Sequence, residues 1–78
     1  MIVCIYDVRF ARKDIKTPGN YGFAIVVARS RQQAKRTFES DTGMKVDAMY
    51  QLTRIRVPEP DVPFRPVVVY RGKLWKDD

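Results

Sequence analysis

Side chains of two different kinds alternate, residue by residue, in two stretches of this 78-residue chain. In residues 2–10 one parity is wholly apolar or aromatic: Ile2, Cys4, Tyr6, Val8 and Phe10. In residues 21–29 one parity is bulky and the other is mostly small: Gly22, Ala24, Val26 and Ala28. Successive side chains of a strand point to opposite faces, so both stretches predict β-strands. The small side chains predict that another element, most naturally a helix, packs closely on that face.

A single helix is predicted over residues 31–40. Ser30 and Gln33 have the Ser-x-x-Gln spacing of a capping box at a helix start. Ala34 and Phe38 are four residues apart and predict a narrow buried stripe, and Gly43 suits the left-handed position that ends a helix. A helix this short is not stable alone in water, so we expect it to lean on a sheet.

Three further strands and an extended loop are predicted in the second half. Residues 44–57 read as a strand whose alternation changes phase between Leu52 and Ile55, as a bulge would cause. Residues 58–66 contain four prolines and predict an extended surface loop. Residues 67–70 predict a β-branched strand, Arg71-Gly72 a turn, and residues 73–75 a short returning strand.

These segments predict a single α+β domain spanning residues 1–78. We expect a small antiparallel β-sheet of four to five strands, in the sequence order β-β-α-β-β-β, with one α-helix packed on one face. The strands at residues 2–10, 21–29 and 67–70 are expected at its centre. A chain of this length hides roughly 60% of its surface on folding, which is enough for one thin core layer.

The residue types argue against several classes of function. The chain has no histidine and one cysteine, which excludes His-based metal sites, Ser-His-Asp triads and a disulfide scaffold. We also find no glycine-rich phosphate loop, and so expect no catalytic residue, no metal and no cofactor. We expect no signal peptide and no membrane span, and a lone cysteine suits a reducing compartment, so the predicted location is cytoplasmic.

The positive charge is concentrated in the first half of the chain. Residues 1–36 hold eight basic and two acidic side chains, whereas residues 37–78 hold seven of each, for a net charge of +6. Such a field attracts anionic partners, although a solvated surface would look the same. The predicted partner-binding residues lie on the long connection after residue 10 and on the helix: Arg12, Lys13, Lys16, Arg31, Gln33, Lys35 and Arg36.

Like charges crowd the predicted helix. Arg31 and Lys35 are four residues apart, a spacing at which two cations repel each other by a few tenths of a kcal/mol. Only Glu39, four residues after Lys35, is expected to offset this repulsion. A partner that neutralises the cluster would explain it, and so would an ordinary exposed helix face.

Aromatic and basic residues also lie next to each other on the predicted strands. The examples are residues 6–10, Tyr50 near Arg54 and Arg56, and Tyr70-Arg71. Such neighbours are typical of a sheet that stacks the bases of single-stranded nucleic acid. Aromatic side chains on strands more often serve the core or cross-strand packing, and both interpretations stay open at this point.

The helix start resembles that of a known group of proteins. The run at residues 28–36 follows a strand and opens a helix with Ser…Gln-Ala-Lys-Arg, and residues 67–75 read Val-Val-Val-Tyr-Arg-Gly-Lys-Leu-Trp. This arrangement resembles the small basic type I anti-CRISPR proteins of phages, most closely a type I-F inhibitor. The resemblance extends over most of residues 2–76 through a short motif and a layout. The proline-rich loop and the long basic connection depart from it.

The resemblance implies an anti-CRISPR inhibitor without catalysis. Such proteins bind backbone subunits of the type I Cascade surveillance complex in the bacterial host cell and sterically block target DNA recognition. A contact role carries over to Gln33, Lys35 and Arg36, whereas Arg12, Lys13, Lys16 and Arg31 are candidates from charge alone. The alternative is a small basic nucleic-acid-binding module. Direct contact with DNA or RNA, and a monomer or a homodimer through exposed sheet edges, stay open.

Overall fold

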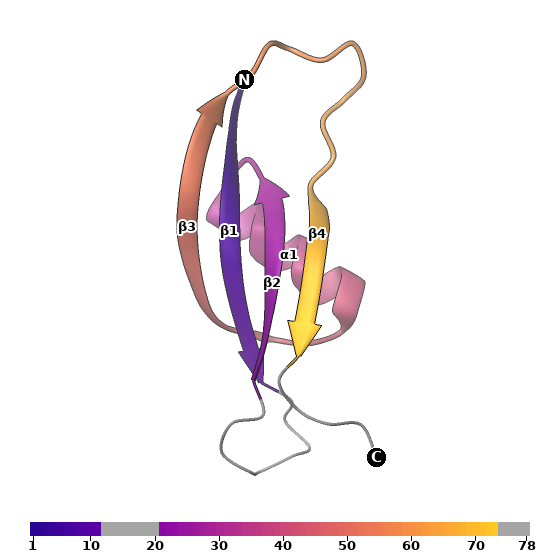
Figure 1. The fold of residues 1–78 in the computed structure, drawn as a ribbon. Coiled ribbons are helices and arrows are strands. Elements are labelled where there is room, and N and C mark those ends of the chain that lie inside the picture. The colour runs from indigo at the N-terminus through magenta and orange to yellow at the C-terminus, as the bar shows by residue number, and fades with distance from the viewer. Residues whose placement is uncertain (12–20, 74–78) are drawn as a thin grey trace.

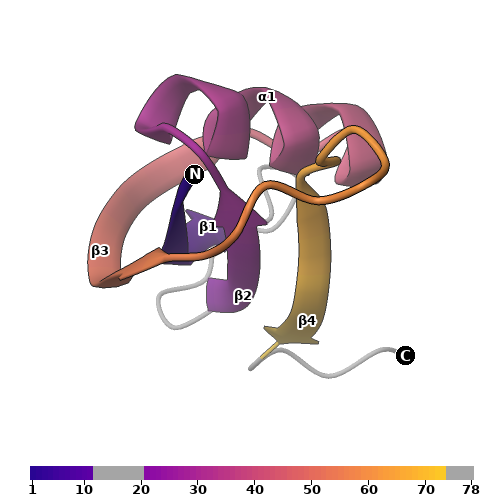
Figure 2. The ribbon, with the colours of Figure 1, turned by 90° about the horizontal axis from the view of Figure 1, so that it is seen from above.

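Strands β1 (Ile2–Ala11) and β2 (Tyr21–Ala28) form the middle of a four-stranded antiparallel sheet in the computed structural model of the chain. β3 (Val46–Arg56) pairs with β1, and β4 (Val67–Lys73) pairs with β2, which gives the order β3-β1-β2-β4. The helix α1 (Arg31–Thr42) crosses one face of this sheet (Figures 1 and 2). The structure describes residues 1–11 and 21–73.

The predicted α+β class, the antiparallel sheet and the single helix are confirmed, with the element order β-β-α-β-β. The predicted turn at Arg71-Gly72 is wrong, because these residues continue β4 and pair with Ala24 and Phe23 of β2. Lys73 likewise belongs to β4, and the rest of the predicted fifth strand, residues 74–75, lies outside the described residues. β2 extends far enough to form backbone pairs with the residues of β4 that follow Tyr70.

The expected place of β4 at the centre of the sheet is also wrong. β4 pairs with β2 alone, and β3 occupies the other side of β1, so β3 and β4 are the two edges. Burial follows this order, since Val67 is 50% exposed whereas Val27, its partner on the same face of β2, is only partly exposed. A β-branched run is therefore compatible with an edge when only one of its faces is covered.

The core lies between α1 and one face of the two central strands. Its buried side chains come from alternate positions of β1 and β2 and from two positions of α1: Cys4, Tyr6, Val8, Phe10, Ala24, Val26, Ala28, Ala34 and Phe38. This is the parity that the alternation predicted for the helix-facing side. Phe38 meets Phe10 with a ring-centroid distance of 4.9 Å and an interplanar angle of 43°. Such tilted pairs add to the stabilisation that burial alone provides.

The helix ends are capped as the sequence predicts. Ser30 Oγ accepts a hydrogen bond from the Gln33 backbone N–H at 3.1 Å. Gln33 Oε1 accepts one from the Arg29 backbone N–H at 2.7 Å, one residue earlier than in an ordinary capping box. Gly43 adopts a positive φ of 71° and donates its N–H to Glu39 O at 2.9 Å. In the part of the chain that the structure describes, no helix is long and apolar enough to cross a bilayer.

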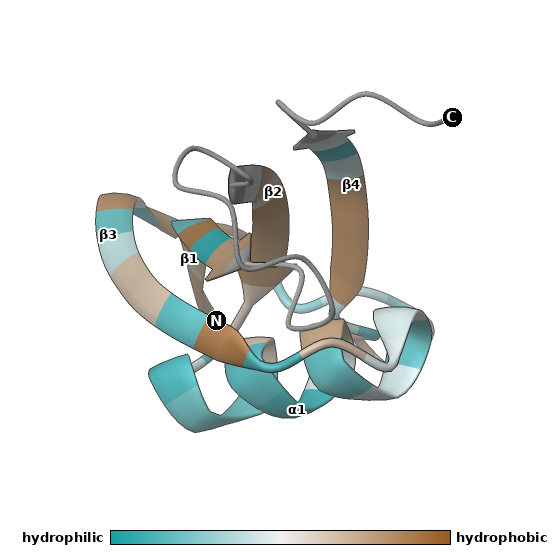
Figure 3. Ribbon diagram, turned by 90° about the horizontal axis from the view of Figure 1, so that it is seen from below, coloured by the Kyte–Doolittle hydropathy of each residue, from teal (hydrophilic) through white to brown (hydrophobic). Residues whose placement is uncertain are grey.

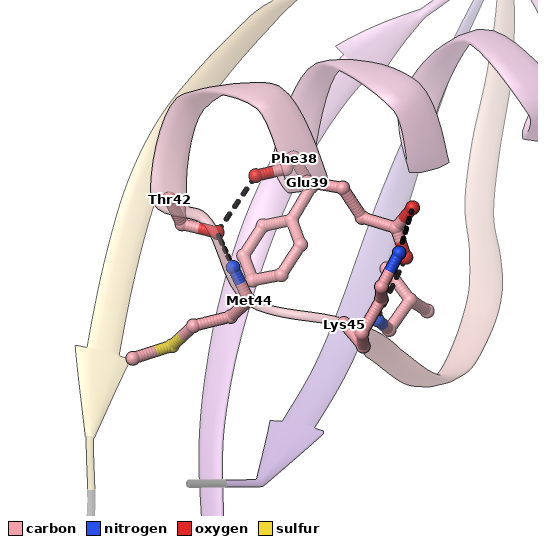
Figure 4. Close-up of polar contacts among 6 residues, drawn as sticks. Phe38, Glu39, Thr42, Met44 and Lys45 are labelled. Atoms are coloured by element: carbon pink, nitrogen blue, oxygen red, sulfur yellow. Dashed lines mark hydrogen bonds and ion pairs between the residues drawn. The ribbon is translucent and has the colours of Figure 1, made fainter. Parts of the chain in front are cut away.

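A polar junction joins α1 to β3 (Figure 4). Thr42 Oγ1 donates to Phe38 O at 2.7 Å and accepts the Met44 backbone N–H at 3.1 Å. Glu39 accepts the Val46 backbone N–H at 3.3 Å and lies 3.8 Å from Lys45 Nζ. The carboxylate of Glu39 thus contacts the start of β3, and its predicted offset of the Lys35 charge involves no ion pair within 4.0 Å.

Register shifts set the faces of the edge strands. Ile5 pairs with Thr53 and Tyr6 with Gln51, so Leu52 is an extra residue in β3, and a second shift lies at Asp47. The predicted change of phase in this strand is thus confirmed. A shift in β4 leaves Val69 as its extra residue. Because of these bulges, Tyr50 and Tyr70 lie on the face of the sheet opposite α1.

Gly22 is required by the packing of Phe10. A Cβ added at Gly22 would lie 2.3–2.9 Å from ring carbons of Phe10, which is itself held against Phe38 in the core. We expect Gly22→Ala to lower the free energy of unfolding by about 1–3 kcal/mol through overpacking, as measured by urea denaturation. Gly72→Ala is the matched control, since its Cβ would meet Phe23 and Tyr70 at 3.0–3.2 Å on the uncovered face, where the rings can move. An equal loss in both variants would contradict this explanation.

Candidate anion-binding surface

Four cationic side chains lie along the side of the molecule where the start of α1 meets β3. We call this group the basic strip: Arg31, Lys35, Arg54 and Arg56. Arg54 pairs with Cys4 and Arg56 with Ile2, so both project from the face of β3 that α1 covers only in part. Side chains two residues apart on one strand face are separated by about 7 Å. The strip therefore presents a row of charges and not a single point charge.

Arg31 links the helix to this strand. Its Nη2 donates a hydrogen bond to the Met49 backbone carbonyl of β3 at 2.7 Å, although the side chain remains exposed. Lys35 follows one helical turn later on the same side of α1. The contact holds the first turn of the helix against β3, so the cations of the two elements share one surface.

The phenol of Tyr6 reports the position of the strip. Tyr6 is 2% exposed, and its burial raises its pKa, as does a hydrogen bond with the Cys4 thiol. The positive charges of Arg31 and Arg54 act in the opposite direction and lower it. Both guanidinium groups are therefore close enough to the same buried hydroxyl to affect its pKa.

The charges of the strip are not neutralised by the described part of the chain. Among residues 1–11 and 21–73, no carboxylate lies within 4.0 Å of the cationic nitrogens of Arg31, Lys35, Arg54 or Arg56. Two of the described carboxylates pair with other cations, Asp7 with Arg9 on the opposite face of the sheet and Glu39 with Lys45. A shallow, open hollow of about 210 Å³ lies at Ile2, Arg54, Ile55 and Arg56. This arrangement suits an anionic group better than a cationic or neutral one.

The predicted partner-binding residues divide into four groups. Arg31 and Lys35 belong to the strip, and both are exposed. Arg36 is exposed but lies about 100° further round the helix than Lys35, so it points away from β3. Gln33 is half-buried and holds the Arg29 N–H, which is a structural role. Arg12, Lys13 and Lys16 lie outside the described residues.

Arg54 and Arg56 were not predicted as partner-binding residues. They follow the bulge at Leu52, which makes their face impossible to derive from unbroken alternation. Because Arg54 and Arg56 are two residues apart in a predicted strand, the sequence does place both side chains on one face of that strand. Which side that is depends on the pairing with β1.

The predicted base-stacking surface is not assembled as the sequence suggested. Tyr6 and Phe10 are buried in the core beneath α1. Tyr50 lies on the opposite face of the sheet from Arg54 because of the bulge at Leu52, and Tyr70 lies on the opposite face from Arg71 because neighbours in a strand point to opposite sides. Instead Arg9 Cζ lies 5.8 Å from the centre of the Phe23 ring, a pairing between strands.

A second hollow, of about 490 Å³, lies beneath the proline-rich loop. It is lined by Arg29 and Gln33 and by several loop residues, among them Glu59 and Asp61. The amino group of Met1 lies 3.5 Å from Glu59 and donates to the Val57 carbonyl at 2.9 Å. Acidic and basic groups are mixed here, so the hollow has no clear preference for a charged ligand. Among the described residues, no three His, Cys, Asp or Glu side chains form a metal-binding group.

Comparison with family models, with curated proteins and with solved structures found no match to this chain.

Burial of Tyr6 predicts a loss of stability at alkaline pH. A tyrosine in the unfolded chain ionises near pH 10.0, and the folded state raises the pKa of Tyr6 above this value. The unfolded state therefore loses this proton first, and the free energy of unfolding should fall as pH rises above about 10. Tyr6→Phe should reduce this fall relative to the parent in urea titrations at several pH values. Identical alkaline slopes in both proteins would contradict the prediction.

Proposed function

We propose that this chain is a non-catalytic binding protein whose basic strip engages an anionic surface on a macromolecule. The observation that carries the proposal is the set of four cations from α1 and β3 that no described carboxylate neutralises. Each exposed charge pair contributes only about 0.2–1 kcal/mol, so several must act together for useful affinity. A row of cations on one side of a small domain meets that condition.

The proposed partner is a protein: a backbone subunit of a type I Cascade surveillance complex in a bacterial host cell. Support for this partner comes from the resemblance of the helix start and the strand layout to anti-CRISPR proteins. The strip would then pair with carboxylates on the backbone subunits and block access of target DNA by its bulk. Of the residues with a carried-over contact role, Lys35 lies in the strip and Arg36 is exposed beside it, whereas Gln33 supports the helix.

Affinity capture tests the protein partner directly. The immobilised protein is exposed to lysate of bacteria that express a type I system, with and without nuclease, and the retained proteins are identified by mass spectrometry. We expect surveillance-complex backbone subunits to be retained after nuclease treatment. The proposal is wrong if these subunits are absent in lysates from every type I subtype tested.

Direct nucleic-acid binding is the second candidate, and the unneutralised strip favours it as well. The four cations predict a salt dependence for single-stranded DNA with a slope of about −3 in log K against log salt concentration. Stacking on aromatic rings is not part of this candidate, since Tyr50 and Tyr70 lie on the other face of the sheet. Retention of nucleic acid alone, lost on nuclease treatment, would select it.

Charge reversal identifies the surface for either partner. We expect Lys35→Glu and Arg54→Glu each to weaken binding about ten-fold, because each removes one attraction and adds one repulsion. Arg65→Glu is the matched control, since it changes the net charge equally from an exposed position on the proline-rich loop. Binding is measured by fluorescence anisotropy for DNA and by biolayer interferometry for a captured protein. Equal weakening by Arg65→Glu would mean that only net charge matters and would overturn the assignment of the strip.

A further inference from the structure

The face of the sheet opposite α1 is apolar, and no element of the described chain covers it (Figure 2). Several of its side chains are exposed, with Ile55 at 45%, Tyr70 at 54% and Tyr50 at 57%. We call this surface the open face, and its apolar members come from all four strands: Ile5, Phe23, Ile25, Val27, Tyr50, Ile55, Val67 and Tyr70. Figure 3 shows that β2 and β4 are hydrophobic over most of their length whereas the outer side of α1 is hydrophilic.

The open face differs from the rest of the molecule in charge. Among the strand residues that the structure describes and pairs on this face, the charged side chains are Asp7 and Arg9, which hold each other through hydrogen bonds of 2.8 and 3.1 Å. These described residues give the face no net charge, although the chain as a whole carries +6. An anionic polymer would find no attraction here. Two copies of this chain repel each other at their basic strips, but their open faces can approach each other without that repulsion.

The size of the open face is sufficient for a weak specific interface. Four strands about 4.8 Å apart and about eight residues long at 3.3 Å per residue give a footprint of about 500 Å² per copy. Two such footprints give about 1,000 Å², the lower limit for a specific protein interface. Aromatic anchors are present as well, since Phe23 and Tyr70 form a tilted pair with a ring-centroid distance of 5.5 Å.

We propose that two copies of this chain associate through their open faces. The complex is a sandwich of two sheets, about 10 Å apart, with an α1 helix on each outer side. The basic strips then lie on the outside, and both remain accessible to an anionic partner. The proposal goes beyond the proposed function and does not depend on it, because self-association is measured without any partner.

Sedimentation equilibrium over a range of protein concentrations tests the proposal. We expect the wild-type protein to approach twice the 9.1 kDa mass of one chain as its concentration rises. Ile55→Lys and Tyr70→Lys should each raise the dimer dissociation constant at least ten-fold, because each places a charge in the apolar interface. These residues lie on β3 and β4, the opposite edges of the sheet, so a common effect points to the face between them.

Val62→Lys is the matched control. Val62 is 71% exposed and lies in the proline-rich loop away from the sheet, and the substitution adds the same charge. We expect this variant to associate as the wild type does, and circular dichroism confirms that all three variants are folded. A wild-type protein that remains at 9.1 kDa at every concentration would overturn the proposal, and so would equal weakening by Val62→Lys.

Two further measurements separate this interface from its competitors. Pairing through a sheet edge would protect backbone amides of β3 or β4 from hydrogen exchange on association, whereas contact between open faces leaves those edges exposed to solvent. Salt should strengthen the association, since it screens repulsion between two +6 chains and leaves apolar burial intact. Binding of an anionic partner to the basic strip should instead weaken with salt. Protected edge amides or a dimer weakened by salt would each contradict the proposal.

Discussion

The close approach of α1 to the central strands is the constraint on which the rest of the structure depends. Gly22, Ala24 and Ala28 on β2 leave room for the helix, and Phe38 fills it by packing on Phe10. With nine side chains in the buried cluster, this contact supplies most of the fully buried apolar surface of the described chain. The helix has no other apolar stripe, so its position on the sheet is determined by Ala34 and Phe38.

The position of the helix divides the sheet into two faces with different chemistry. On the covered side, the Arg31 contact with the Met49 carbonyl brings the cations of α1 beside those of β3. On the other side, apolar side chains remain exposed, and Asp7 and Arg9 neutralise each other. Charge and apolar surface are thus separated by the thickness of one sheet. A protein built this way can bind an anionic partner on one side and a neutral apolar surface on the other.

The bulges contribute to this separation. If the alternation ran unbroken through Leu52, without the bulge, Tyr50 would share the face of Arg54 and Arg56, and the aromatic and basic groups would lie together. The shift at Val69 similarly allows both Val68 to face the core and Tyr70 to face away from it. The bulges at Leu52 and Val69 therefore determine whether the molecule presents a mixed surface or two distinct ones.

Local sequence determined the strands at residues 2–10 and 21–29, their two faces, and the helix with its Ser30 and Gly43 caps. These features depend on side-chain periodicity and on hydrogen bonds between near neighbours, so the sequence alone contains them. The order of the strands, the continuation of β4 through Arg71-Gly72 and the union of Arg31 and Lys35 with Arg54 and Arg56 were decided by tertiary structure. Each of these depends on which strand pairs with which and in what register. Pairing between distant segments is determined by the packing of the whole chain and not by any local pattern.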